Sequence, residues 1–146
     1  IMSTLNKDAA EAMIEVGAHA CTDVTGFGLL GHLKVLLDNS GVGADLYLEN
    51  IPIIEKAWDL AKEGMVPGGS ARNRLWIEDE IDWSTSISDI AKSILMDAQT
   101  SGGLLISVDP KNEEKLHKEL KKRGVLGSTI GTVTKDTKIN VFDRPA

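Results

Sequence analysis

The leucines between residues 27 and 39 recur at the spacing of one helix face and predict a buried helix there. They stand at positions i, i+1, i+4, i+7 and i+8 of this stretch: Leu29, Leu30, Leu33, Leu36 and Leu37. Ser40 and Gly41 follow and are expected to end the helix. A loop with two glycines, Gly26 and Gly28, leads into it. The pattern therefore predicts a loop that feeds the N-terminus of a buried helix.

Four further segments carry helical patterns. They cover residues 5–16, 53–63, 87–96 and 110–123. Asn6 is a plausible cap for the first, which Gly17 closes, and Ser86 or Ser88 is expected to cap the third. The residues of segment 64–74 predict a loop with a Gly-Gly turn. Ser70 is expected to cap a short helix that follows this turn.

Short apolar runs predict five strands between these helices. They cover residues 18–22, 42–48, 104–108, 128–133 and 138–142, and the first and third are expected to be buried. The last two are predicted to pair with each other as a closing hairpin. The acidic run 78–86 is expected to be solvated surface. Because helices and strands interleave and the hairpin is antiparallel, the predicted fold class is α+β, a mixed α/β sandwich.

Composition narrows the class of protein. A chain of 146 residues with 42% hydrophobic and 26% charged residues is expected to form a single domain with its own core. A net charge of −6 argues against general nucleic-acid binding, whereas a nucleotide can still be held by Mg²⁺ and backbone donors. Cys21 is the one cysteine, so the chain forms no internal disulfide. Short apolar runs and the lack of a signal-peptide pattern predict a cytoplasmic protein.

Asp23 is the strongest candidate for chemistry. It follows the predicted strand 18–22, and ligand sites of α/β sheets gather at such strand ends. Carboxylate oxygens suit Mg²⁺, and the helix start beyond offers N–H groups that an oxyanion can approach at Gly26 and Gly28. From these residues alone two interpretations stay open. Either the loop holds a metal and a phosphate, or Asp23 caps the helix and the glycines serve close packing.

Three strings, in this order, resemble the C-terminal domain of the selenophosphate synthetase (selenide, water dikinase) family. They are Thr22–His32, Pro67–Asn73 and Asp97–Leu105. The resemblance covers nearly the whole chain but only about the second half of a family member. It implies that residues 1–146 are one domain, the C-terminal half of a larger enzyme whose N-terminal ATP-binding half is absent. The fold it implies is a mixed sheet flanked by helices, as in the C-terminal domain of aminoimidazole ribonucleotide synthetase-like enzymes.

The resemblance also implies an activity. Family members make selenophosphate, AMP and phosphate from ATP, selenide and water with Mg²⁺, and they pair as homodimers when full length. In that setting Asp23 is a Mg²⁺ ligand beside the ATP phosphates. Four residues form the phosphate-facing loop: Thr22, Thr25, Gly26 and Gly28. No catalytic residue is expected in this chain, because the family's reactive cysteine or selenocysteine and its partner lysine lie in the N-terminal half. Cys21 is therefore not the nucleophile, and this half alone is predicted to be inactive.

Two other functions stay open. One is another ATP-dependent enzyme of the same superfamily, similar to thiamine-monophosphate kinase or to a hydrogenase-maturation enzyme, which the string Asp97–Leu105 disfavours. The other is a non-catalytic interaction module.

Several residues of the three strings are less informative. His32 is expected to be hydrogen-bonded rather than catalytic, and Arg72 to lie on the surface, with an anion contact as the alternative. The loop 97–103 is expected to be mainly structural, with Ala98 where the family usually has proline. No role is predicted for Asn73.

Overall fold

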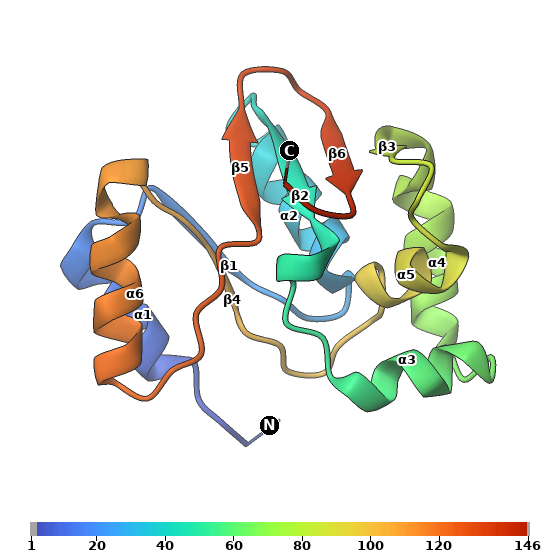
Figure 1. Cartoon of the computed structure of the whole chain (residues 1–146), viewed down its shortest axis with the longest axis horizontal. Coiled ribbons are helices and arrows are strands. Elements are labelled where there is room, and N and C mark those ends of the chain that lie inside the picture. Colours follow the sequence, from blue (N-terminus) through green and yellow to red (C-terminus); the bar gives the residue numbers. More distant parts are fainter. Residues whose placement is uncertain (1–2, 146) are drawn as a thin grey trace.

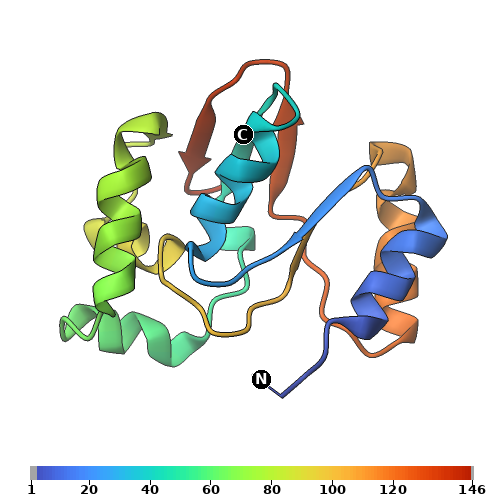
Figure 2. The same ribbon diagram turned by 180° about the vertical axis from the view of Figure 1, so that it is seen from behind.

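The computed structural model describes residues 3–145 and is built around a narrow ribbon of two strands. Strands β1 (Ala20–Asp23) and β4 (Leu104–Ser107) pair antiparallel and cross the middle of the molecule (Figure 1). Helices α1 (Lys7–Val16) and α6 (Glu113–Lys122) lie side by side at one end of the ribbon, and the helices within residues 55–95 lie at its opposite end (Figure 2). Helix α2 (Gly28–Asp38) lies beside β1 in the middle of the molecule. Both strands were expected to be buried, but they are only half-buried. A ribbon of two strands leaves two edges open, which explains the difference.

A second sheet has four strands in the order β3-β6-β2-β5. These are β2 (Gly43–Tyr47), β3 (Ile81–Trp83), β5 (Gly131–Thr134) and β6 (Ile139–Phe142). Strand β5 is antiparallel to β2, whereas β6 is parallel to β2 and to β3. The prediction of a closing hairpin is therefore wrong, because β2 lies between β5 and β6. Since β2 is largely buried, with Ala44 and Leu46 in the core, both of its edges need backbone partners, and β5 and β6 supply one each.

The acidic run 78–86 is only partly solvated surface. Asp79, Glu80 and Asp82 are exposed as expected. Ile81, however, is buried and begins β3, where it pairs with Ile139. Two alternating apolar residues, Ile81 and Trp83, among carboxylates were too short a signal to predict an edge strand.

The helices lie near their predicted positions, with one addition. They are α2 (Gly28–Asp38), α3 (Glu55–Lys62), α4 (Gly68–Ile77) and α5 (Asp89–Leu95), and 3-10 turns cover Leu48–Asn50, Glu78–Glu80 and Pro110–Asn112. Helix α4 replaces most of the loop predicted at 64–74, and Ser70 lies inside it rather than capping it. Two adjacent glycines are poor helix formers, so tertiary contacts rather than local propensity hold this first turn.

Gly17 and Ser88 lie at helix ends as predicted. Gly17 closes α1 with a left-handed φ of 81°, and the Ser88 hydroxyl caps α5 by accepting from the Ala91 amide at 3.2 Å. Asn6 precedes α1, but its side chain does not cap it. Instead its amide donates to the Gly102 carbonyl at 3.3 Å, which ties the start of α1 to the segment before β4.

Helix α2 forms the centre of the larger core. Leu30, Leu33 and Leu37 are buried there against the four-stranded sheet, α4 and α5, while Leu29 and Leu36 are half-buried. A smaller cluster joins α1 and α6 to one face of β4. No helix within residues 3–145 is long and apolar enough to cross a membrane.

Candidate functional site

The three strings that lie far apart in the sequence meet in space. Residues 24–27 form the turn between β1 and α2, residues 96–103 connect α5 to β4, and the first half of α4 lies beside both. Backbone hydrogen bonds join the first two segments directly. The Val24 amide donates to Gly103 (3.0 Å), Gly102 donates to Val24 (2.9 Å), and Gln99 donates to Thr25 (3.0 Å). The turn after Asp23 is therefore fixed along one side.

Two buried side chains of α4 hold the other side. The Asn73 amide donates to the carbonyls of Gly26 (2.9 Å) and Met96 (3.1 Å), one from each segment. The Ser70 hydroxyl donates to the Asp97 carboxylate (2.6 Å) and accepts from the Ala98 amide (3.0 Å). The two side chains are only 7% and 2% exposed. Helix α4 thus holds both segments in place, and at least Asp97 and Ala98 of the loop 97–103 take part in these structural contacts.

Sequence reasoning missed these contacts of α4 because it placed Ser70 in a loop and gave Asn73 no role. The available signal was their spacing. Residues i and i+3 share a helix face, so two small polar residues at that spacing in an otherwise apolar contact are candidates for buried hydrogen bonds. That signal is readable only once residues 68–77 are known to be helical.

The two glycines of the turn serve different purposes. Gly28 has φ +70°, and a Cβ there would lie 2.8 Å from the Met96 carbonyl carbon and the Asp97 carbonyl oxygen. Close packing therefore requires a glycine at this position. Gly26 is exposed, and a Cβ there would meet nothing within 4 Å. The space beside Gly26 is thus open to a ligand, whereas the space beside Gly28 is filled by protein.

Asp23 is exposed at the end of β1 and faces Leu104 across the ribbon. Phe27 holds the N-cap position of α2 and no side chain caps it there, so the interpretation of Asp23 as the cap is wrong. The one side-chain hydrogen bond that reaches Asp23 within residues 3–145 comes from Thr22 and ends on the backbone carbonyl (3.1 Å). It leaves the carboxylate without a partner. An unpaired, exposed carboxylate beside an open turn suits a hard cation.

This chain supplies only part of a metal site. Within the described part of the chain, no three His, Cys, Asp or Glu side chains lie close enough together to hold a metal ion. A Mg²⁺ ion at Asp23 would therefore need oxygen ligands from a bound phosphate or from another segment. Cys21 lies near Asp23, and burial together with the Asp23 charge raises the pKa of its thiol. A thiol whose pKa is raised is a poor nucleophile at neutral pH.

His32 is hydrogen-bonded, as expected. Its Nε2 atom lies 3.0 Å from the Thr25 hydroxyl and accepts from the Phe27 amide at 3.4 Å. The Phe27 ring lies between His32 and Trp76 of α4, with ring centroids 5.3 and 5.5 Å apart. A shallow hollow of about 380 Å³ between β1 and α2 is lined in part by His32, Cys21 and Thr22. Arg72 is exposed, as expected of a surface arginine, and its contact with an anion stays a prediction.

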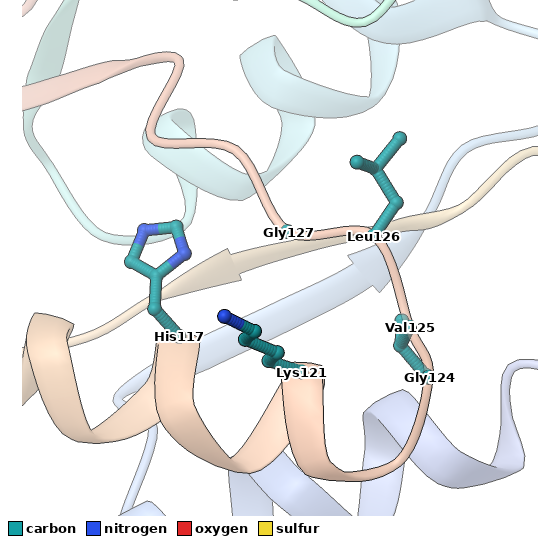
Figure 3. A pocket seen from close by; sticks show the side chains of 6 residues that line it. All are labelled: His117, Lys121, Gly124, Val125, Leu126 and Gly127. Atoms are coloured by element: carbon teal, nitrogen blue, oxygen red, sulfur yellow. The ribbon is translucent and has the colours of Figure 1, made fainter.

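A second hollow, of about 390 Å³, lies at the other end of the ribbon. His117 and Lys121 of α6 border it together with the turn at residues 124–127, as Figure 3 shows. The His117 Nε2 atom lies 2.8 Å from the hydroxyl of Thr129, which in turn donates to Glu113 at 2.6 Å. The two hollows share no lining residue. None of the residues predicted to bind a ligand borders this second hollow.

The chain resembles known proteins over nearly its whole length. A family model described as "AIR synthase related protein, C-terminal domain" matches residues 2–144. A selenide, water dikinase from Carboxydothermus hydrogenoformans is 46% identical over 134 residues, 92% of this chain and 39% of that protein. Another, from Caldanaerobacter subterraneus subsp. tengcongensis, is 40% identical over 145 residues, 99% of this chain and 42% of that protein. This chain therefore spans about two fifths of the length of these relatives.

Solved structures share the fold. A structure of T. maritima PurL complexed with FGAR matches with a TM-score of 0.61 at 16% identity, over 95% of this chain and 18% of that one. Thiamine-monophosphate kinase from Stenotrophomonas maltophilia matches with a TM-score of 0.59 at 19% identity, over 88% of this chain and 33% of that one. The expected fold class, a mixed sheet flanked by helices, is confirmed, and so is the resemblance drawn from the three strings. The chain belongs to the family of C-terminal domains of AIR synthase related proteins, and its sequence is similar to those of selenide, water dikinases.

Proposed function

We propose that this chain is the C-terminal domain of a selenophosphate synthetase, which makes selenophosphate, AMP and phosphate from ATP, selenide and water. The observation that carries the proposal is the convergence of three separate strings on one turn, which leaves the Asp23 carboxylate exposed and unpaired. The 46% identity to a selenide, water dikinase supports the choice of substrate.

The geometry suggests how the work is divided within such an enzyme. Asp23 would hold Mg²⁺ together with ATP phosphate oxygens, and the metal would supply charge neutralisation for phosphoryl transfer. Gly26 leaves room for a phosphate to approach the backbone, while Gly28, Asn73 and Ser70 keep the turn in place. Because one carboxylate does not make a metal site, the remaining ligands and the nucleophile belong to the N-terminal half. We propose that residues 1–146 alone are inactive, that the full-length protein is a homodimer, and that it acts in the cytoplasm.

The test uses the full-length protein with the Asp23→Asn substitution. Formation of AMP from ATP is measured in the presence and absence of selenide. We expect a loss of roughly a hundredfold or more, the order found when a group that stabilises transition-state charge is removed. Asp79→Asn is the matched control, because Asp79 is also an exposed carboxylate but lies beyond the C-terminus of α4, and it should retain activity.

The same assay separates the alternatives. If the full-length protein turns over ATP with thiamine monophosphate or another acceptor but not with selenide, the chain serves a related kinase. If Asp23→Asn leaves selenide-dependent turnover unchanged, Asp23 is not a metal ligand and the domain is an interaction module.

A further inference from the structure

His32 lies one turn into α2, but its ring reaches back over the turn that follows Asp23. Its Nε2 atom lies 3.0 Å from the Thr25 hydroxyl and 3.4 Å from the Phe27 amide nitrogen. The N-cap residue Phe27 offers no side-chain acceptor, so the first turn of α2 lacks an ordinary cap. We infer that His32 is a positioning residue, which fixes the turn 24–28 and thereby sets the place of Asp23. The inference deepens the proposed function and rests on it for its effect on activity.

The hydrogen bonds determine which ring nitrogen carries the proton. A backbone N–H can only donate, so Nε2 must offer its lone pair to Phe27. The neutral ring therefore carries its proton on Nδ1, and the Thr25 hydroxyl directs its single proton to the same Nε2 lone pair, which the two donors share. It follows that the Thr25 O–H does not donate to a bound phosphate in this arrangement. Thr25 would contribute to the loop through its geometry, and the open backbone at Gly26 would remain for an anion.

His32 completes a set of anchors around the turn. Val24 is held through both its amide and its carbonyl by the segment 102–103, and the Gly26 carbonyl is held by Asn73. The side chain of Thr25, which lies between these two anchors, and the amide of Phe27, which directly follows the second, have His32 as their acceptor. Loss of that acceptor frees Thr25 and Phe27, two and four residues from Asp23, while the anchors at Val24 and Gly26 remain.

Two substitutions of His32 separate its hydrogen bonding from its bulk. His32→Gln keeps an acceptor at about the distance of Nε2, whereas His32→Phe keeps a ring that can stack on Phe27 but accepts nothing. In the full-length enzyme we expect His32→Phe to raise the Mg²⁺ concentration needed for half-maximal rate by roughly tenfold, since two hydrogen bonds that order the ligand loop are lost. His32→Gln should recover most of this loss.

The matched control is His117→Phe. His117 also contacts a threonine hydroxyl, that of Thr129 at 2.8 Å, but it lies at the opposite end of the ribbon. It should leave the Mg²⁺ requirement unchanged. Equal impairment by Phe and Gln at position 32, or no impairment by Phe, would overturn the inference.

A second measurement is independent of activity. Full-length protein labelled with ¹⁵N-histidine is studied by NMR at about pH 8.5, where an unperturbed imidazole is neutral. The signals of His32 are those missing from the His32→Gln spectrum. We expect an unprotonated Nε2 and a protonated Nδ1, and the opposite tautomer would overturn the inference. If the enzyme shows no selenide-dependent turnover at all, the proposed function fails, while the tautomer still tests the placement of His32.

Discussion

Removal of the Asn73 side chain tests whether α4 holds the site together. In Asn73→Ala the carbonyls of Gly26 and Met96 lose their donor, which bonds them at 2.9 and 3.1 Å. Each such hydrogen bond contributes about 1 kcal/mol net, and a buried acceptor left unsatisfied costs about 1–3 kcal/mol. Met96 is fully buried, whereas Gly26 is exposed and water can replace its partner. We therefore expect a loss of about 2–4 kcal/mol in the free energy of unfolding, most of it from the Met96 side.

The measurement is equilibrium unfolding in urea, followed by tryptophan fluorescence, because Trp76 lies on the same helix. With a slope of about 2 kcal/mol per molar urea, the midpoint should fall by about 1–2 M. Asn39→Ala is the control. Asn39 also donates to a backbone carbonyl, that of Val35 at 2.8 Å, but both residues are exposed, so its effect should stay within about 0.5 kcal/mol. Similar midpoint shifts in the two variants would refute the claim that buried hydrogen bonds from α4 hold the two segments.

Three further predictions concern the core and its surroundings. Gly28→Ala should lower the thermal midpoint by several degrees, because of its φ of +70° and the backbone 2.8 Å away, whereas Gly26→Ala should be nearly neutral in the same melting experiment. Leu30→Ala should cost about 3 kcal/mol in urea unfolding, since its side chain is fully buried. Hydrogen bonds from Arg74 lower the pKa of Glu78 below its ordinary 4.5, so the stabilisation from this pair is complete above that pH and disappears as the pH falls through the lowered pKa. Urea midpoints measured from about pH 6 to pH 3 should therefore fall less steeply in Arg74→Met than in the unsubstituted protein, and parallel curves would contradict this account.

Local sequence patterns predicted much of this fold because local forces decide those parts. The leucine spacing between residues 27 and 39 placed α2, since an amphipathic helix must bury its stripe. Gly17 marked the C-terminal end of α1 because glycine readily adopts a left-handed φ, and Ser88 marked the N-terminal end of α5 because its hydroxyl accepts from a free amide of the first turn. The order of the three strings identified the family without any structure, because it depends on residue identity alone.

The errors arose where tertiary contacts override local preference. Strands β5 and β6 are close in sequence and look like a hairpin, yet β2 offers each of them a more deeply buried partner. The first turn of α4 contains Gly68 and Gly69, which locally favour a loop. It is helical because Ser70 and Asn73 find partners in segments more than twenty residues away. No pattern within residues 64–74 contains that information.

The distribution of hydrogen bonds around the turn makes the strongest case for a ligand at Asp23. The Asp97 carboxylate, which comes from the neighbouring segment, accepts a bond from Ser70, and Glu78 at the C-terminal end of α4 pairs with Arg74. The backbone of the turn is held at Val24, at Gly26 and through His32. Asp23 extends from this ordered frame into solvent, and no hydrogen bond or ion pair within residues 3–145 reaches its carboxylate. A fixed backbone lowers the entropic cost of holding the Asp23 carboxylate in a defined place. That benefit is realised only if a cation or another group binds to the carboxylate.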